Sequence, residues 1–513
     1  MFRRLNCSFF IICHLFIFVS VYGQYKLEFE GNKFFSDRIL GHEILFLTYP
    51  TATEGDLAKA MQILQNYYED NGFLLSEVRY KLSGKGNIKD TVLFNITEGQ
   101  RFYLGKVRIT GLKYNRQEFV RKFIDFEANM PLSREVILNM QKELDNSALF
   151  DSIRFSVDKF DFKTRRVDLL LNVWERKPFF LGSGIGFDSE DGLKFIGETG
   201  GRHLRGNGQS ARLEGSCSFY YASHVMLKHL LIQGKYYFPL LMSRNLQLEN
   251  EMFYESDKPS YVSFHFKKAA LESNLRFFIY KNLSWNMGAI LSKVWLSSAL
   301  DENRLNGAIQ SKVDQNRQIH FRLTFASVFP AINPVNGMRA DLLYEYNGGF
   351  LGGANDFHRI STSTSWYFPL GLKNVFAFHL EGGWAESLSA GKPVPEYERF
   401  FLGGAQNLRG YRNNKLGPKN EYGRYIGGLA MLYYSFEFRH MWSSHWQFVW
   451  FLDNGELKGN FYKITLRSII LTTGPGIRYR WHGNLFSFDL GIKISEFEWN
   501  DPGWISFGYG QHF

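Results

Sequence analysis

The chain has 513 residues, of which 17% are aromatic and 48 are glycine, and its mean hydropathy is −0.24. The formal net charge of +10 suits an anionic membrane surface or nucleic acid, although scattered, solvated Lys and Arg explain the excess equally well. After residue 23 no apolar run is long enough for a membrane-spanning helix, which excludes a helical membrane protein.

The first residues have the pattern of a secretory signal peptide. Met1–Arg4 is basic, Phe9–Val21 is apolar, and the small residues Val21 and Gly23 stand just before a suitable cleavage point. We therefore expect residues 1–23 to be removed and the protein to be exported. Nucleic acid is not an expected partner of an exported chain.

Cysteine usage limits the covalent chemistry of the mature chain. Cys7 and Cys13 lie in the predicted signal peptide, which leaves only Cys217. A single cysteine forms no internal disulfide and no thiolate metal cluster. Because no cysteine stands at the predicted cleavage point, a lipoprotein anchor is not expected either.

Residues 24–100 and 101–178 contain two copies of one pattern: a short strand ending at a glycine, a stretch with helical spacing, and two strands ending at a glutamate. The matching positions are Gly31 and Gly111, Leu57–Tyr68 and Ile137–Leu144, and Glu98 and Glu175. We predict two small α+β modules, each with helices on a small sheet whose edge can accept a client's strand. The alternative is a coincidental similarity of two modules.

Residues 179–513 lose the helical period and read as alternating strands. Apolar side chains alternate with Ser487, Asp489, Gly491 and Lys493 along Leu485–Ile494. Charged side chains at period two, with many aromatics, indicate one face toward lipid and the other toward a wet lumen. At strand lengths of roughly ten residues, the region predicts a transmembrane antiparallel β-barrel of about sixteen strands. A secreted sandwich or propeller is the alternative, disfavoured because Ile505–Phe513 alternates to its aromatic end.

One loop within this region is unusual. Phe400–Tyr411 places Arg409 between a glycine-rich approach, Gly403 and Gly404, and the pair Gly410-Tyr411. The planar guanidinium suits a fixed carboxylate partner, and glycine permits backbone conformations closed to other residues. The alternative is a solvated, glycine-rich hairpin loop.

The twin modules, the barrel pattern and this loop together resemble the BamA/TamA superfamily, outer-membrane barrels preceded by periplasmic POTRA domains (the bacterial surface antigen family). The motifs that carry the resemblance are Leu402–Gly404 with Leu408–Tyr411, Asn333–Arg339, Gly427-Gly428 with Glu437–Arg439, and Phe451–Gly455. The resemblance implies an outer-membrane location with the POTRA modules in the periplasm. It also implies an Arg409 that contacts the inner barrel wall at Asp453, with Glu437 as a second acceptor.

The residue pattern agrees with that implication, because Phe448, Trp450 and Leu452 alternate on the lipid-seeking face and leave Asp453 facing inward. A bidentate pair of Arg409 and Asp453 would fasten a long loop to the wall. The alternative is that both groups are solvated in a wide lumen.

The strands that must close the barrel are rich in glycine, which weakens strand interiors. The first strand, Phe179–Asp188, carries Gly182, Gly184 and Gly186 on one face, and the last carries Gly508, Gly510 and the terminal Phe513. We expect a weak lateral seam that parts to admit a client strand. The alternative is that glycine relieves crowding where the loop enters the lumen.

The expected function is assembly, insertion or translocation of outer-membrane proteins, through POTRA edges and the seam, by a TamA-like or accessory member. The alternatives are a dedicated two-partner-type secretion pore, disfavoured because Tyr25 begins a strand with no plug helix before it, and a passive porin or surface antigen. No catalytic, phosphate-binding or metal-binding motif is found, so we expect no enzyme, cofactor or metal. Expected partners are lipid, client proteins and periplasmic or lipoprotein subunits.

Overall fold

The computed structural model describes most of the chain after the predicted signal peptide, which itself lies outside the described residues. The described ranges are 25–48, 53–83, 90–124, 130–188, 192–221, 225–239, 246–258, 264–280, 282–298, 312–330, 333–371, 373–465, 469–481, 484–495 and 499–509. The chain divides into two compact units, Met1–Arg176 and Lys177–Phe513. Each unit is described by itself.

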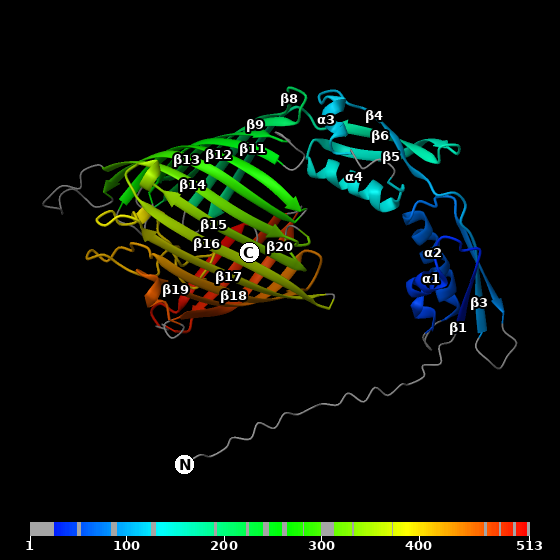
Figure 1. The fold of residues 1–513 in the computed structure, drawn as a ribbon. Helices are drawn as coiled ribbons and strands as arrows, with labels where there is room; N and C mark the ends of the chain where they lie inside the picture. Colours follow the sequence, from blue (N-terminus) through cyan, green and yellow to red (C-terminus); the bar gives the residue numbers. More distant parts are fainter. Residues whose placement is uncertain are drawn as a thin grey trace, which may run out of the picture. The chain divides into compact units, whose positions relative to one another are not determined.

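The first unit holds two modules of the same construction (Figure 1). The first module consists of β1 (Tyr25–Glu30), α1 (Asp37–Glu43), the short helix η1 (Leu45–Thr48), α2 (Glu54–Asp70), β2 (Glu77–Ser83) and β3 (Asp90–Thr97). The second consists of β4 (Tyr103–Thr110), α3 (Gln117–Arg121), α4 (Arg134–Asn146), β5 (Phe150–Asp161) and β6 (Arg166–Glu175). Their sheet orders, β1-β3-β2 and β4-β6-β5, are equivalent, with the last strand of each module in the centre.

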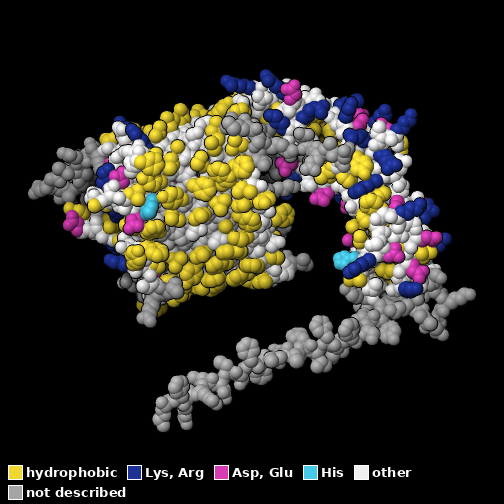
Figure 2. Space-filling view, viewed as in Figure 1, with side chains coloured by type: hydrophobic (Ala, Val, Ile, Leu, Met, Phe, Trp, Pro, Cys, Tyr) yellow, Lys and Arg dark blue, Asp and Glu magenta, His cyan; other side chains and the backbone are white. Residues whose placement is uncertain are grey.

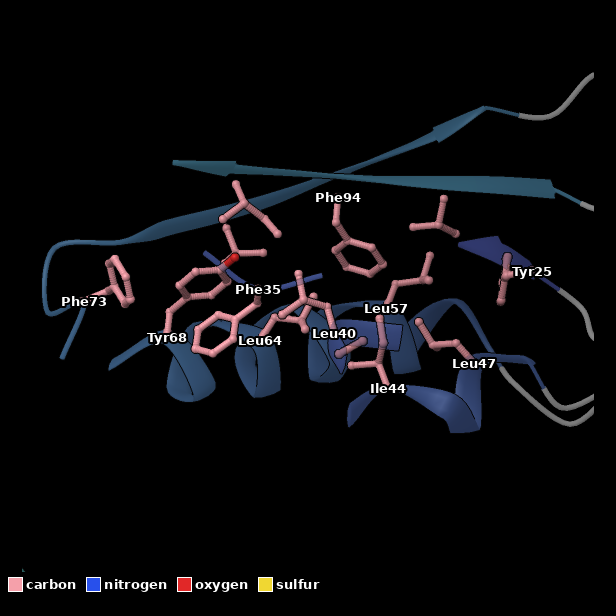
Figure 3. Close-up of a cluster of buried hydrophobic side chains, with 14 residues drawn as sticks. Tyr25, Phe35, Leu40, Ile44, Leu47, Leu57, Leu64, Tyr68, Phe73 and Phe94 are labelled. Atoms are coloured by element: carbon pink, nitrogen blue, oxygen red, sulfur yellow. The ribbon is translucent and has the colours of Figure 1, made fainter. Parts of the chain in front are cut away.

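A compact apolar core holds the helices of the first module against its sheet. Leu57, Leu64 and Tyr68 recur at helical spacing along α2 and are fully buried. Phe94 of the central strand β3 points toward them, and Leu40 of α1 joins the same cluster (Figure 3). Burial of this apolar face is the main stabilisation of so short a module.

The longer helix of each module starts at a hydroxyl residue that organises its first turn. The Asp56 carboxylate accepts a hydrogen bond from the backbone N–H of Thr53 at 2.9 Å. In α4 the Ser133 hydroxyl accepts one from the backbone N–H of Val136 at 3.2 Å. Such caps satisfy N–H groups that have no partner within the helix, and so fix where the helix begins.

The repeated glycine and glutamate have matching structural roles in both modules. Gly31 and Gly111 have φ of +87° and +89°, and a Cβ at either would lie 2.1 Å from a backbone oxygen of the neighbouring strand. The Glu98 carboxylate accepts hydrogen bonds from the Phe34 N–H and the Tyr68 hydroxyl. The Glu175 carboxylate accepts them from backbone N–H groups at the corresponding turn, those of Lys113, Tyr114 and Asn115. The two modules therefore share the same turn after their first strand.

The second unit is one antiparallel sheet of sixteen strands in the described residues, ordered from β7 to β22 and rolled into a barrel (Figure 1). The first eight strands are β7 (Phe179–Asp188), β8 (Gly192–Leu204), β9 (Gln209–Tyr221), β10 (Val225–Phe238), β11 (Leu246–Asp257), β12 (Phe264–Tyr280), β13 (Leu283–Ser298) and β14 (Lys312–Ala326). The rest are β15 (Gly337–Asn347), β16 (Phe357–Leu370), β17 (Asn374–Ser387), β18 (Ala430–Met441), β19 (Trp446–Lys458), β20 (Ile470–Trp481), β21 (Asn484–Lys493) and β22 (Gly503–Tyr509). The sequence prediction of a barrel of about sixteen strands is confirmed.

The register of the strands sorts their side chains into an outward and an inward set. Directly paired residues share a face, and successive residues alternate. Phe448 and Trp450 of β19 are 40% and 50% exposed, whereas the alternate residues Val449, Phe451 and Asp453 are fully buried. The outer surface of the barrel is accordingly covered by hydrophobic side chains (Figure 2). The wet, polar face lines the lumen.

The ends of several elements differ from the sequence prediction by a few residues. The alternating stretch predicted over Leu485–Ile494 forms β21 one residue earlier, and the helical stretch Leu57–Tyr68 lies inside the longer α2. Strand β22 is described only as far as Tyr509, so Gly510 and Phe513 lie outside the described residues. Amphipathic periodicity locates the middle of an element better than its ends, because the ends depend on caps and turns.

Candidate functional site: a loop fastened inside the barrel

The connection between β17 and β18, residues 388–429, is folded against the inner wall of the barrel. Leu402 and Leu408 of this loop are fully buried, and they pack in one cluster with Tyr433 of β18 and Leu457 of β19. The backbone N–H of Gly403 donates to the Asn407 side chain at 2.8 Å. A loop with its own apolar side chains buried holds a defined conformation.

The three predicted glycines let the backbone turn tightly within this loop. Gly403, Gly404 and Gly410 have φ of +107°, +112° and +99°. A Cβ at Gly403 would lie 2.6 Å from the backbone oxygen of Arg412, and one at Gly404 2.6 Å from Asn413. A side chain at either position is therefore excluded both by conformation and by space.

Arg409 is completely buried and contacts the wall through every part of its guanidinium group. Its Nε and Nη2 donate to the two oxygens of Asp453 at 2.8 and 2.7 Å, and its Nη1 donates to Glu437 at 2.7 Å. Nη2 also donates to the Ser435 hydroxyl, and the guanidinium lies 3.6 Å from the centre of the Phe451 ring. The Arg409 backbone N–H donates to Asp453 as well. This bidentate arrangement uses the planar geometry that a lysine lacks.

Further charged groups surround this pair on the inward faces of β18, β20 and β21. Arg439 donates to Glu437 at 2.7 Å, and Arg478 donates to Asp489 at 2.7 Å. Asp489 also lies 3.9 Å from Arg409. Three arginines and three carboxylates thus balance one another in a region almost closed to solvent. Buried charges of this kind are tolerated only when they are paired.

One glycine on the wall allows the loop backbone to come very close, and another makes room for the Asp489 side chain of the wall itself. A Cβ at Gly491 of β21 would lie 2.2 Å from the backbone nitrogen of Gly410, and one at Gly476 would lie 2.0 Å from Asp489. Any other residue at Gly491 would push the Arg409–Gly410 segment off the wall. The seat of the loop is therefore built into the backbone of the barrel as well as its side chains.

The same loop has a second attachment on a different part of the wall. The Tyr397 hydroxyl donates to Asp314 of β14 at 2.8 Å and accepts hydrogen bonds from the amides of Asn316 and Asn355. Its neighbour Glu398 lies 3.6 Å from Arg359 of β16 and 3.7 Å from Lys268 of β12. We call this set the Tyr397 attachment. Together with Arg409, it connects one loop to two separate groups of strands.

Strands β7 and β22, which form the predicted seam, are the two edge strands of the sheet. Strands β7 and β22 lie beside each other, but no hydrogen-bonded register joins them in the described residues. Gly182, Gly184 and Gly186 share the inward face of β7, and Gly508 shares that of β22. Among the residues that the structure describes, a Cβ at Gly184 or Gly186 would meet no atom within 4 Å. Crowding by the loop therefore accounts for Gly491, which lies against the backbone of Arg409 and Gly410, but not for these two glycines.

The structure brings together Arg409, Asp453 and Glu437 and keeps the seam glycines apart from them. Several participants are absent from the sequence prediction: Ser435, Asp489, Arg439, Arg478, Tyr397 and Glu398. The alternation along β21 marks Asp489 as inward, and Arg439 lies two positions after Glu437 on the same face. The sequence holds no comparable signal for Tyr397, which lies in a loop without periodicity.

Within the described ranges, no group of three His, Cys, Asp or Glu side chains is placed to hold a metal ion. No helix among the described residues has the length and apolar character needed to cross a membrane.

Two strand–helix–strand modules and a sixteen-strand barrel with a loop fastened in its lumen define a class of outer-membrane protein. The model of the Omp85 superfamily domain matches residues 203–513, and that of the surface antigen variable number repeat, or POTRA, matches residues 25–99. The chain belongs to the Omp85 superfamily. It is an outer-membrane protein whose POTRA modules lie in the periplasm.

Individual relatives support the same assignment. The chain is 23% identical over 386 residues to the outer membrane protein assembly factor BamA of Nitratidesulfovibrio vulgaris, covering 74% of this chain and 46% of that protein. It thus spans about half the length of the curated relatives it matches. BamA from Haemophilus ducreyi lacking POTRA domains 1–3 has a similar structure, with a TM-score of 0.68, 18% identity, and coverage of 95% and 99% of the two chains. CdiB from Acinetobacter baumannii gives a TM-score of 0.54, 15% identity, and coverage of 95% and 89%.

Proposed function

We propose that this protein assembles other β-barrel proteins into the outer membrane by admitting their strands at the seam between β7 and β22. The observation that carries the proposal is that the two terminal strands of the sheet lie side by side without a hydrogen-bonded register in the described residues. An unpaired strand edge is a ready template for a strand from another chain. The likeness to assembly factors named BamA supports the same function.

The composition of β7 supports a seam that parts easily. Phe179, Leu181, Ile185 and Phe187 face outward and are 61–86% exposed, as expected beside lipid. Gly184 and Gly186 on the inward face have open space around them in the described part of the lumen. Glycine contributes no cross-strand side-chain contact, so β7 has little to hold its partner. A client strand can then pair with the edge while its apolar face enters lipid.

The POTRA modules offer strand edges that can receive clients before they reach the barrel. The free edges are β1 and β2 in the first module and β4 and β5 in the second. Strand β5 pairs with β6 through two register shifts, between Phe150 and Ser152 and between Val157 and Lys159, whereas β2 pairs without any. Bulges interrupt an edge and protect it from pairing. We therefore propose that client strands pair with the edge of β2 in preference to the edge of β5.

The second candidate function is a dedicated secretion pore for one exported protein. The barrel and its modules also resemble CdiB over most of their length, so the fold itself is compatible with either function. The seam favours insertion, because a substrate that passes along the lumen does not require the two terminal strands to part.

Depletion of the protein, followed by comparison of the outer-membrane and secreted proteomes, tests this proposal. We expect many barrel proteins to decrease in the outer membrane, with restoration by the wild-type chain supplied in trans. Loss of a single secreted protein, with all outer-membrane barrels unchanged, would contradict insertion and favour the secretion pore. No change in either fraction would contradict both.

A further inference from the structure

The outward faces of β12, β13 and β14 each carry one Lys or Arg toward the same end of the barrel, displaced in the register by two residues from strand to strand. Paired residues share a face, so the outward positions of these strands are the odd-numbered ones. These outward cations are Lys267 on β12, Lys293 on β13 and Arg317 on β14, and they lie toward the end of the barrel where β13 finishes, beside the outward aromatic Trp295. In the described residues of β11–β14, no outward position holds Asp or Glu. The result is a cationic edge on an apolar band.

A groove runs along this outward face and ends at two of the cations. It has a volume of about 630 Å³, and its outward lining includes Ile232, Met252, Leu271 and Leu291, with Lys293 and Arg317 at one end. An adjoining hollow of about 800 Å³ shares Leu213, Gly234, Met252, Leu271 and Leu291 with it. Hollows of roughly 300–1,000 Å³ are the usual size for ligand sites. The floor is recessed where small residues, Gly234 and Ala269, stand among the larger ones.

Both cations are exposed, and neither has a carboxylate partner among the residues that the structure describes. Arg317 donates through Nη1 to the backbone oxygen of Leu351, and the Lys293 ammonium lies 5.2 Å from the centre of the Trp295 ring. No ion pair in the described residues involves either side chain. Their charge is thus available to an anion at the edge of the membrane, where long cationic side chains reach lipid headgroups.

The position of the cations along the barrel selects one leaflet. Only Arg176, Lys177 and Pro178 separate the periplasmic modules from the start of β7, so β7 begins at the periplasmic end. Strict antiparallel order then places the end of β13 and the start of β14 at the opposite, outer end. Lys293 and Arg317 therefore face the outer leaflet.

We propose that this groove binds a phosphorylated, multiply acylated glycolipid of the outer leaflet, of the lipid A type. The apolar floor receives acyl chains, and the two adjoining hollows hold more than one of them. Lys293 and Arg317 bind a phosphate, to which a guanidinium can donate in bidentate fashion. A single-tailed or neutral lipid lacks one or both of these features.

Lipid binding by the purified full chain tests the proposal. The protein is reconstituted in phosphatidylethanolamine nanodiscs that contain lipid A or, separately, phosphatidylglycerol, and retained lipid is measured by native mass spectrometry. We expect preferential retention of lipid A. The variant Lys293→Gln/Arg317→Gln should bind lipid A about 25-fold more weakly, since each cation near a membrane surface contributes roughly fivefold.

Two further variants separate this site from general charge and folding effects. Arg322→Gln removes one cation from the opposite, inward face of β14 and should leave binding unchanged. Gly234→Leu should weaken binding by filling the groove, because a Cβ there would lie 3.5 Å from Met252, an ordinary contact that the fold tolerates. Wild-type binding by the double variant, an equal loss with Arg322→Gln, or equal retention of phosphatidylglycerol would each overturn the proposal. A folded, heat-modifiable band for every variant establishes that the barrels are intact.

Discussion

Arg409 has no access to solvent, and four acceptor oxygens on the wall surround its guanidinium and backbone N–H. A charge in such a place is stable only with its counterions, and the counterions are equally dependent on it. Asp453 and Glu437 are themselves fully buried. Arg409 therefore fastens the loop to the wall. Removal of Arg409, or of the carboxylates that it pairs with, should destabilise the barrel.

Replacement of Arg409 by alanine should destabilise the barrel by about 3–5 kcal/mol, because it leaves buried carboxylates unpaired. Arg409→Lys should recover only part of this loss, since one ammonium group cannot reach both Asp453 and Glu437 with the same geometry. Urea unfolding of the barrel in lipid vesicles, followed by tryptophan fluorescence, measures the difference. Asp453→Ala should resemble Arg409→Ala, and the double variant should lose less than the sum of the two. Additive losses, or wild-type stability in both single variants, would contradict the pairing.

The residues of this fastening could be predicted only in part. Arg409, Asp453 and Glu437 follow from a motif resemblance and from alternation along a single strand. The pairing of Arg478 with Asp489 depends on the register between β20 and β21, which alternation within one strand does not contain. The register between neighbouring strands, which the hairpin turns help to set, determines which inward side chains lie opposite each other.

At the scale of elements, the loop 388–429 is attached at two places rather than one. Arg409 connects it to β18 and β19, and Tyr397 connects it to β14 and to Asn355 just before β16. Because the loop is bound to two separate groups of strands, it connects them across the lumen. A single attachment would fix only the loop. The strands that surround it were predictable from their period, but Tyr397 has no such signal and required the folded chain.

Tyr397→Phe tests the second attachment. Loss of the hydroxyl removes the donor to Asp314 and should cost about 1–3 kcal/mol, because buried polar partners lose a hydrogen bond without gaining water. Limited proteolysis should also cut the loop faster, since one of its two fixed points is gone. Tyr422→Phe is the matched control, because Tyr422 lies in the same loop and is 56% exposed. Equal behaviour of the two variants would show that the Tyr397 attachment does not hold the loop.

At the scale of the whole molecule, the attachments of the loop and the proposed seam involve largely different strands of the barrel. The loop and its charged groups contact strands from β14 to β22, including Trp504 of β22 under Arg412, whereas β7 contributes glycines with open space in the described lumen to its junction with β22. The proposed function requires that the barrel part at this junction while the loop holds the remaining strands. The repeated modules and the barrel class were predictable from sequence because both depend on periodicity. The lack of a register at the junction, within the residues that the structure describes, emerges only from the folded sheet.

The central claim, that clients enter between β7 and β22, is tested most directly by locking the two strands together. In a Cys217→Ser background, Gly184→Cys is combined with Ser506→Cys or with Gly508→Cys, because all these positions face inward. A cysteine pair at Ala340 and Thr364, on the already paired strands β15 and β16, serves as the control. Folding of a barrel client into proteoliposomes should stop when the seam is oxidised, resume on reduction, and continue throughout in the control. Full client folding by a quantitatively cross-linked seam would contradict the account.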